Sequence, residues 1–533
     1  MRIGIDLDNT IVSYEKLLMR IASRLGVKNI TNPSLAKREI KNKLNEDPGM
    51  DYRWQRIQGL LYGRFLKYAD PMPGVLNFLA LCKVRGYEVF IVSHKTEFGH
   101  FDETKNPLRN SALRWLDAKL IDGQGKPFFR HDSIFFSSTQ KDKISIIEKL
   151  DFDFFIDDLA EILNAINHAK LSKILFSNLP ESIGLNWREI SLAVCGVFTD
   201  KDCANAYNLN FPGQNVSVEQ IVHGGNSRVF KVTPVMGVPV VLKKYPPNLA
   251  GDRSRQLTET LAYRLLENSE YTAKLLYSDF ITGYNLYSWI NGEKVQSFSG
   301  KDLDIALGFI RELISLSKKN IGSVPMASEA CTAIKDIFFQ INSRLRDLGA
   351  IDDGELNKFL LNTFIPTYEL AQKKIILDNG YEFTHKRLQE QNWILSPSDF
   401  GFHNSLKLID GNVIFLDFEY FGFDDPAKLI NDFVWHPGML ISDEMKKSWT
   451  HSVLNLLPND QSLSQRVKAS WPLYGLRWAL IVLKEFTGDG WSDRNYARSS
   501  LEGLKSERLA GQLAKSRAII KTLTDAKMES LYV

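Results

Sequence analysis

The chain has 533 residues, too many for one ordinary hydrophobic core, and its apolar and charged fractions are those of globular domains. A net charge of +3 gives no reason to expect a nucleic-acid partner, and the four cysteines form no CxxC pair that would indicate a zinc site or a disulfide framework. We expect a soluble cytoplasmic protein without membrane insertion. The segment MRIGIDLDNTIV carries acids where a secretory signal is apolar, and 478–483 is too short to span a bilayer.

The first part of the chain alternates short β-branched runs with segments of helical length. The runs that we expect to be buried parallel strands are 3–7, 88–93, 133–137, 152–157 and 173–177. This alternation predicts an α/β fold with a doubly wound parallel sheet, whose ligands bind at the carboxyl ends of the strands. The mostly helical sequence of about 12–70, between the first two strands, predicts an inserted cap.

The sequence DLDNT ends the first of these strands and carries two carboxylates, Asp6 and Asp8, with Thr10 just beyond. Residues two apart on a strand point to the same side, so both acids face one crevice. Burying this like charge is costly unless a cation or a reaction makes use of it. The triplet alone is a weak motif, and its position directly after a predicted strand gives it weight.

Further polar residues follow in the order that phosphoaspartate chemistry needs. Ser93 ends the run VFIVS and could donate a hydrogen bond to phosphate. Lys143 begins a helix and could neutralise a phosphoryl group, although Lys141 lies two residues away. Asp157 and Asp158 end FDFFIDD and could bind Mg²⁺ through hard oxygen ligands. Each residue alone has a structural explanation, such as a helix cap or a solvated charge, but the set favours an active site.

The set DLDNT, VFIVS, Lys143 and FFIDD resembles the four motifs of the haloacid-dehalogenase superfamily, over about residues 1–195. The resemblance implies that Asp6 is a nucleophile forming an aspartyl-phosphate and that Asp8 is the acid/base. An Asp at position 8, where a small apolar residue could stand, favours phosphatase over dehalogenase chemistry.

The same resemblance implies a magnesium site and a phosphate site. The metal would be held by Asp6, the backbone carbonyl of Asp8 and Asp157, with Asp158 assisting. The substrate phosphate would contact Thr10 and Ser93.

After about residue 194 the pattern changes to strand-like runs joined by turns, and helix-rich sequence follows from about residue 254. The runs 215–222, 227–233 and 238–245 predict an antiparallel meander. We therefore expect a second domain at 196–533, with lobes of about 196–290 and 291–533.

Three features of this second half suggest a nucleotide site. HGGNSRVF lies between predicted strands, where backbone N–H groups approach phosphates closely; the residues concerned are Gly224, Gly225, Asn226 and Ser227. Lys243 ends the run VPVVL, and Glu259 lies early on an amphipathic helix, so the two could pair. An ordinary hairpin turn and two surface charges are the alternatives.

The strongest signal is WILSPSDFGFHNSL followed by VIFLDFEYFG. Asp399 and Asn404 lie five residues apart, and Asp417 ends the next apolar run. Kinase chemistry needs a carboxylate to accept the substrate hydroxyl proton, and an amide and a second carboxylate to hold Mg²⁺ against ATP phosphates. Asp399, Asn404 and Asp417 fill these roles in the required order.

This half resembles the aminoglycoside phosphotransferase/choline kinase family in VVLKKYP, TETLAYRLL, NLYSWINGEKV, SDFGFHN and DFEYFGFDDP. The resemblance implies a bilobal α+β protein-kinase-like fold, ATP between the lobes and a small-molecule hydroxyl as acceptor. One departure is that Pro397 and Ser398 stand where the family usually has His-Gly. Acceptor contacts are sought among the C-terminal helices, at Glu419, Tyr420, Trp435, Arg477 and Trp478. Aromatic residues there could cage a quaternary amine, with packing of the helical core as the stronger alternative.

The sequence therefore predicts a bifunctional enzyme that uses Mg²⁺ and ATP, a phosphatase joined to a small-molecule kinase. The expected substrates are sugars, polyols or amino alcohols and phosphate esters, for example precursors of surface polysaccharide. One alternative is a choline-type or aminoglycoside-type kinase with a regulatory, non-catalytic N-terminal module. Another is a catalytically inactive assembly scaffold. The oligomeric state is not encoded in any of these patterns.

Overall fold

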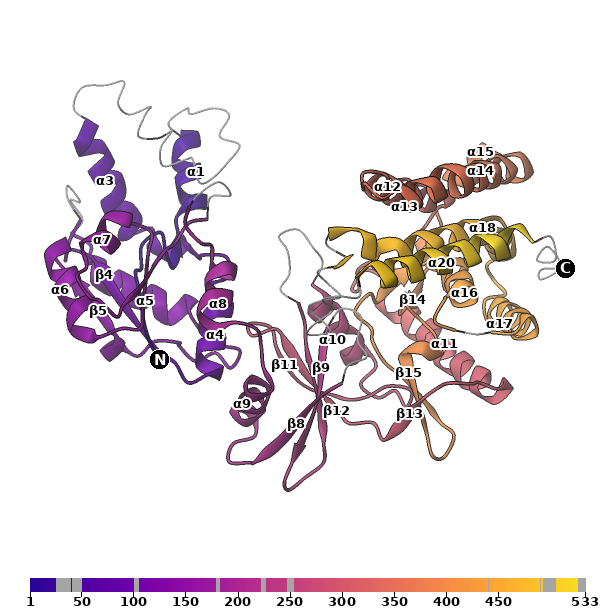
Figure 1. The fold of residues 1–533 in the computed structure, drawn as a ribbon, viewed down its shortest axis with the longest axis horizontal. Coiled ribbons are helices and arrows are strands. Elements are labelled where there is room, and N and C mark those ends of the chain that lie inside the picture. The colour runs from indigo at the N-terminus through magenta and orange to yellow at the C-terminus, as the bar shows by residue number, and fades with distance from the viewer. Residues whose placement is uncertain are drawn as a thin grey trace. The chain divides into compact units, whose positions relative to one another are not determined.

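The computed structural model describes residues 1–24, 40, 50–99, 105–178, 183–221, 227–246, 254–439, 441–488, 490–491 and 505–525. The chain divides into two compact units (Figure 1). The first comprises Met1–Asn215 with Asp279–Thr282, and the second comprises Val216–Ser278 with Gly283–Val533. Among the described helices, none is both long enough and apolar enough to cross a membrane.

The first unit is built on a five-stranded parallel sheet, in the order β5-β4-β1-β6-β7. Its strands are β1 (Arg2–Ile5), β4 (Glu88–His94), β5 (Ile134–Ser137), β6 (Phe154–Asp157) and β7 (Ser172–Leu175). Each lies within or beside one of the five predicted runs, so the predicted parallel α/β sheet is confirmed. At the centre, a Cβ on Gly4 would come within 2.6 Å of the Phe155 side chain, so glycine lets the rings of β6 pack against β1.

Helices cover both faces of this sheet. Ile91 and Ile156 belong to one apolar cluster, and their strand neighbours Val92 and Phe155 belong to another, as the alternation of side chains along a strand requires. The first cluster includes side chains of α4 (Val75–Val84), α5 (Leu108–Lys119) and α8 (Trp187–Cys195). The second includes side chains of α6 (Gln140–Leu150) and α7 (Ala160–Ala165).

The segment where we predicted a cap leaves and rejoins the unit through a short antiparallel pair. The pair consists of β2 (Val12–Ser13) and β3 (Asp70–Pro71). Between them the structure describes α1 (Glu15–Arg24), α3 (Met50–Tyr62) and the short turn η2 (Leu66–Tyr68). Residues 25–39 and 41–49 of the predicted cap lie outside the described residues.

The structural boundary between the units falls after helix α9 (Asp200–Asn210), whereas the predicted domain boundary at 195/196 precedes that helix. The reason is an ion pair between α9 and the segment that follows α4. The Arg85 guanidinium lies 2.7 Å from an Asp202 carboxylate oxygen, and Asp202 is buried. The guanidinium donates two hydrogen bonds, one to each oxygen of the Asp202 carboxylate. Such a bidentate contact at a buried carboxylate is strong, and it holds α9 against the first unit. The cysteines of this region and Cys331 are all free and buried.

The second unit begins with a five-stranded sheet in the order β11-β12-β10-β9-β8. Its strands are β8 (Val216–Ile221), β9 (Arg228–Pro234), β10 (Val240–Lys244), β11 (Leu275–Asp279) and β12 (Tyr284–Ser288). The pairs β8–β9, β9–β10 and β10–β12 are antiparallel, which agrees with the predicted meander. Helix α10 (Arg255–Leu265) lies between β10 and β11 in the chain and carries a buried face.

The rest of the second unit is mostly helical (Figure 1). Its helices are α11 (Gly300–Asn320), α12 (Ile334–Gly349), α13 (Gly354–Phe359), α14 (Ile365–Asn379), α15 (Tyr381–His385), α16 (Pro426–Trp435), α17 (Asp443–Leu456), α18 (Leu463–Ile481) and α20 (Lys505–Thr524). Two small sheets interrupt them, formed by β13 (Gly292–Lys294), β15 (Ser405–Leu408) and β16 (Val413–Phe415), and by β14 (Ile394–Ser396) and β17 (Gly422–Asp424). The loops that leave β14 and β16 carry Asp399 and Asp417.

Candidate functional site

Three carboxylates meet at the carboxyl ends of β1 and β6 in the first unit. Asp6 directly follows β1, and its backbone N–H donates to the Ile156 carbonyl of β6 at 2.9 Å. Oxygens of Asp6, Asp157 and Asp158 all lie within 4.8 Å of one another. The structure thus brings together three of the four carboxylates that the sequence singled out, and Asp8 has other partners. Such a set of hard oxygen donors fits a magnesium ion.

Lys143 lies inside this cluster. Its Nζ is 2.6 Å from Asp6 Oδ1 and 2.7 Å from Asp157 Oδ2, and the side chain is buried. Lys141 is exposed, so geometry favours Lys143 of the two lysines. Burial raises the pKa of Asp6 well above its ordinary value, although Lys143 opposes this. Lys143 brings one positive charge to three carboxyl groups, so a divalent cation bound there would favour their ionised forms.

Replacing Lys143 with Met is expected to lower the free energy of unfolding by about 3 kcal/mol, because it leaves Asp6 and Asp157 buried without their partner. Urea denaturation in magnesium-free buffer measures this. The matched control, Lys141→Met, changes an exposed side chain and is expected to stay within about 0.5 kcal/mol of the wild type. Equal urea midpoints for the two variants would show that Lys143 does not hold the cluster.

Asp8 is held by two residues that sequence reasoning missed. Lys95 Nζ lies 2.8 Å from Asp8 Oδ2, and the Tyr14 hydroxyl donates to Asp8 Oδ1. Lys95 is buried beside the ring of Tyr62 on α3. The sequence held one signal for Lys95: it lies two residues after Ser93. Residues two apart project to the same side of an extended chain, so Lys95 could have been placed on the side of Ser93. Tyr14 and Tyr62 both come from the segment predicted as a cap.

Ser93 and Thr10, the expected phosphate contacts, have different surroundings. Ser93 is 1% exposed, and its hydroxyl has no hydrogen-bond partner among the described residues. A buried hydroxyl without a partner is unfavourable, so this group is available to an oxygen of a bound molecule. The Thr10 hydroxyl donates to Asp158 at 3.4 Å and is buried.

A second charged cluster lies in the second unit, where Lys243 of β10 meets carboxylates from distant segments. Its Nζ is 2.6 Å from Glu259 Oε2 on α10 and 2.8 Å from Asp417 Oδ1 after β16. Glu419 Oε2 lies 4.0 Å away, and the Tyr245 hydroxyl donates to Glu259. The predicted Lys243–Glu259 pair is therefore present in the structure. Glu419, which we predicted as an acceptor contact, lies in this cluster two residues after Asp417, and its contact with an acceptor stays a prediction.

Charge and burial set the protonation of this cluster. Burial by itself would lower the pKa of Lys243, but the surrounding carboxylates raise it well above its ordinary value. The ammonium group therefore stays charged. Burial raises the pKa of Glu259 to about 7, with Lys243 acting in the opposite direction. Oxygens of Glu259, Asp417 and Glu419 lie within 4.8 Å of one another, a donor set that fits a divalent cation.

Asp399 and Asn404 are close to each other and to the strand that leads to Asp417. The Asn404 side chain donates to the Asp399 carbonyl at 3.1 Å, and the Leu416 N–H donates to the Asn404 carbonyl at 2.9 Å. Asp417 has a φ of 67°, which places it in the left-handed region of backbone conformations that residues other than glycine rarely adopt. Strain of this kind persists where the surroundings over-determine the backbone, as they do at active sites.

Two histidines hold the Asp399 carboxylate, and sequence reasoning missed both. His403 Nε2 and His436 Nε2 each lie 3.2 Å from Asp399 Oδ1, and their rings stack with centroids 3.6 Å apart. Burial alone would raise the pKa of Asp399, but hydrogen bonds from His403 and His436 hold it well below its ordinary value. His403 stood within the quoted SDFGFHN motif, whereas nothing local connected His436 with it.

The departure at Pro397 and Ser398 has a local structural counterpart. Ser398 has a φ of 68°, and its hydroxyl accepts a hydrogen bond from Lys428 at 2.7 Å. Lys428 is buried between Asp424 and Asp432, at 3.0 and 3.2 Å. The residue before Asp399 is thus held by a buried lysine.

Three of the predicted glycine-turn residues, Gly224, Gly225 and Asn226, lie outside the described residues. Ser227 is described immediately before β9, and its buried hydroxyl has no hydrogen-bond partner in the described part of the chain. A role of this turn in nucleotide binding stays a prediction.

Most of the predicted acceptor contacts are engaged in the helical core. Trp435 donates to the Trp471 carbonyl at 2.9 Å, and Trp478 donates to Asp432 at 2.9 Å. Arg477 pairs with Asp432 and Glu329. The indoles are less than a tenth exposed, so they pack rather than form an open cage for a quaternary amine. Tyr420 lies beneath the Arg255 guanidinium, 5.9 Å from ring centroid to Cζ.

No protein-family model matches, and no curated protein matches. Several solved structures do resemble it. A choline kinase from Cryptosporidium parvum Iowa II is 14% identical, with a TM-score of 0.36, and the match covers 60% of this chain and 94% of that one.

Two further structures illustrate the range. A thermostable mutant of an aminoglycoside phosphotransferase, in a ternary complex with AMP-PNP and hygromycin B, is 14% identical with a TM-score of 0.41 and covers 61% of this chain and 99% of its own. Plasmodium vivax ethanolamine kinase is 14% identical with a TM-score of 0.40, and the match covers 67% of this chain and 98% of that one. These three structures are of small-molecule kinases.

Proposed function

We propose that the second unit is an ATP-dependent kinase that phosphorylates a hydroxyl group of a small molecule. The observation that carries this proposal is the contact of Lys243 with Glu259 and Asp417, which lie on three separate elements. In kinases, a lysine held by a helix glutamate contacts the nucleotide phosphates, and a nearby carboxylate binds the magnesium ion that accompanies them. Asp399 and Asn404 supply the remaining groups at the same end of β16.

The reaction follows from these positions. The acceptor hydroxyl oxygen forms a bond to the γ-phosphorus of ATP, the bond from this phosphorus to the β,γ-bridging oxygen breaks, and ADP leaves. The hydroxyl proton passes to the Asp399 carboxylate, which His403 and His436 keep ionised and oriented. Asn404 and Asp417 would hold Mg²⁺, which neutralises phosphate charge when bound.

The kinase is expected to lose activity as the pH falls below about 7, the pKa that burial confers on Glu259. Above this pKa Glu259 is ionised and holds Lys243; below it the carboxyl takes up a proton and the ion pair weakens. The profile of kcat/KM for ATP measures the effect, because it reports groups of the free enzyme. Glu259→Gln should remove this acid limb and lower the rate at pH 8, whereas the exposed control Glu267→Gln should retain the wild-type profile.

We further propose that the first unit hydrolyses phosphate monoesters. Asp6 attacks phosphorus, the ester P–O bond breaks, and the leaving oxygen takes a proton from Asp8. Water then attacks the aspartyl-phosphate, passing its proton to Asp8 and releasing phosphate and free Asp6. Asp6 and Asp157 would hold Mg²⁺, which offsets phosphate charge when bound, and Lys143 lies between them.

The observation that favours this second activity is the buried Ser93 hydroxyl, which has no hydrogen-bond partner among the described residues and lies on β4, the strand that pairs with β1. Asp6 of the carboxylate cluster directly follows β1. The insertion residues Tyr14 and Tyr62 lie against Asp8 and Lys95, which supports a small, enclosed ester rather than a phosphoprotein. Incubating the full chain with ATP, Mg²⁺ and a panel of free and phosphorylated sugars and polyols tests both proposals, with ADP reporting the kinase. Hydrolysis of p-nitrophenyl phosphate reports the phosphatase.

If neither product forms, both proposals fail and the inactive scaffold is the better explanation. If ADP forms while p-nitrophenyl phosphate stays intact, the first unit is a regulatory module instead.

A further inference from the structure

The backbone makes a rare turn directly before Asp399. The Asp399 N–H donates to the Pro397 carbonyl at 2.9 Å, so three residues close a γ-turn with Ser398 at its centre. Ser398 has a φ of 68°, and γ-turns with a positive φ at the centre are rare and strained. Strain of this kind persists only where the surroundings over-determine the backbone. The contacts that hold this turn therefore also set the position of the proposed catalytic base.

Ser398 is held from both its backbone and its side chain. Its N–H donates to the Ser396 hydroxyl on β14 at 3.1 Å, and its own hydroxyl accepts a hydrogen bond from Lys428 at 2.7 Å. The hydroxyl also lies 3.4 Å from the Ser328 carbonyl, a longer contact. Because hydrogen bonds from an ammonium group are stronger than those between neutral groups, Lys428 supplies the strongest of these contacts.

Lys428 is itself fixed in place. It lies on α16, all of whose residues are buried, and its Nζ is 3.0 Å from Asp424 Oδ2 and 3.2 Å from Asp432 Oδ2. Burial by itself would lower the pKa of Lys428, but these two carboxylates raise it above its ordinary value, so the ammonium group is charged. Three oxygens thus surround a group with three N–H donors. Any large displacement of Lys428 would leave an acid or the Ser398 hydroxyl without its partner.

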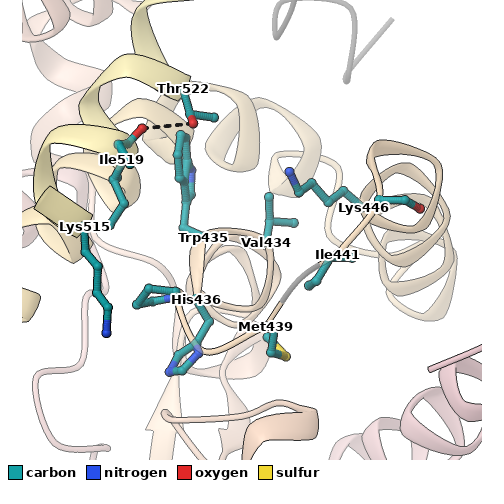
Figure 2. A pocket seen from close by; sticks show the side chains of 12 residues that line it. Val434, Trp435, His436, Met439, Ile441, Lys446, Lys515, Ile519 and Thr522 are labelled. Atoms are coloured by element: carbon teal, nitrogen blue, oxygen red, sulfur yellow. Dashed lines mark hydrogen bonds between the residues drawn. The ribbon is translucent and has the colours of Figure 1, made fainter. Parts of the chain in front are cut away.

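The residue that follows α16 reaches Asp399 itself. Trp435 ends the helix, and the Nε2 atom of the next residue, His436, lies 3.2 Å from Asp399 Oδ1. Figure 2 shows Trp435 and His436 beside a pocket of about 530 Å³ that both residues line. The His436 side chain is 11% exposed and that of Lys428 is 1% exposed, so Lys428 is the more firmly enclosed of the two. Two consecutive residues of the loop, Ser398 and Asp399, are thus held from one part of the fold.

We infer that Lys428 is a positioning residue of the kinase. By binding the Ser398 hydroxyl it holds the strained turn, and the turn fixes the carboxylate of the next residue, Asp399, for the acceptor hydroxyl. The inference rests on the proposed kinase function and adds to it a residue that acts only through the base. A base displaced by about 1 Å is expected to lower the rate by up to about 10²-fold.

The first test removes a single oxygen from this contact in the full chain. Ser398→Ala leaves Lys428 with both of its acids, so the fold should be retained. Its kcat for ADP formation is expected to be about tenfold lower. Its KM for ATP should be unchanged, because the contacts of Lys243 with Glu259 and Asp417 lie on other elements. The acceptor in this assay is the sugar or polyol of the panel that gives the highest ADP release with the unsubstituted chain.

A double-mutant cycle with Asp399→Asn shows whether the effect passes through the base. In Asp399→Asn no carboxylate remains to be positioned, so adding Ser398→Ala should change kcat by less than about twofold. A loss that is merely structural would instead lower kcat by about tenfold again. Ser516→Ala is the matched control, because it removes another buried serine hydroxyl of the second unit, which donates to the Ala479 carbonyl at 2.8 Å. Its kcat should equal that of the wild type.

Lys428→Met removes the other partner of the contact. Its kcat is expected to fall by about 10²-fold with KM for ATP unchanged. Its urea midpoint is expected to fall as well, because Asp424 and Asp432 stay buried without the ammonium group. Circular dichroism and calorimetric titration with AMP-PNP show whether the variant is folded. If it is not, Ser398→Ala and the double-mutant cycle decide alone.

The outcomes separate this inference from the proposal on which it rests. A wild-type kcat in Ser398→Ala, or a loss that multiplies in the Asp399→Asn background, overturns the positioning role of Lys428 and leaves the kinase proposal intact. A loss of the same size in Ser516→Ala does so too. ADP release that Asp399→Asn does not lower, or no ADP release with any acceptor of the panel, overturns the kinase proposal itself.

Discussion

Replacing Asp399 with Asn is expected to lower the kcat of ADP formation by about 10³-fold, because the amide cannot accept the acceptor's proton. The change keeps the shape of the side chain and an oxygen for the hydrogen bonds from His403 and His436. Binding of ATP should persist, because the contacts of Lys243 with Glu259 and Asp417 do not involve Asp399. A coupled assay of ADP, with calorimetric titration of ATP, measures both quantities.

The matched control for this variant is Asp410→Asn, in the exposed turn between β15 and β16. Its kinetics should equal those of the wild type. A near-normal kcat in Asp399→Asn would exclude this residue as the base. A loss of ATP affinity as large as the loss of rate would indicate that the site had collapsed.

Replacing Asp6 with Asn is expected to lower the hydrolysis of p-nitrophenyl phosphate by about 10⁴-fold or more, since it removes the nucleophile itself. The variant should remain folded. Burial raises the pKa of Asp6, which means that this environment penalises the ionised carboxylate, and a neutral amide of the same size removes that penalty. Phosphate release measures the rate, and urea denaturation measures the stability.

Asp132→Asn is the control on the first unit, because Asp132 is exposed and pairs only with Arg130 among the described residues. Kinase activity of Asp6→Asn should be unchanged, and phosphatase activity of Asp399→Asn should be unchanged in turn. If either single substitution silenced both reactions, the two sites would not work independently. Residual hydrolysis in Asp6→Asn that equals the wild type would remove the aspartyl-phosphate step.

Much of the architecture followed from local patterns. The five strands of the parallel sheet match apolar runs, and Asp6 and Asp157 could be placed at the carboxyl ends of strands because position along a strand sets the edge that a residue occupies. That these two strands are neighbours is shown by the structure. The pairing of Lys243 with Glu259 was predicted in the same way, from a strand end and an early helix position. The extent of the first unit was predicted less well, because helix α9 packs through Arg85 and Asp202.

Side-chain partners far apart in the chain were a different matter. Lys141 and Lys143 are equivalent in the sequence, and only helix rotation buries one of them between Asp6 and Asp157. Trp435 and Trp478 looked suited to a cage, but packing of α16 and α18 buries their rings and directs their N–H groups to protein oxygens. Aromatic residues on helices have the same spacing whether they pack or bind, so the sequence does not distinguish the two.

By itself, then, the sequence determined the type and order of the chemical groups: acids at the ends of strands, a lysine for each cluster, and an Asp/Asn pair before a late Asp. These are local properties, set by the strand period and by the residues that end each strand. Only the tertiary structure decided that His436 contacts Asp399, that Lys95 contacts Asp8, and that Lys428 contacts Ser398. Such contacts depend on how helices and loops pack across long stretches of chain, and no short-range pattern encodes that packing.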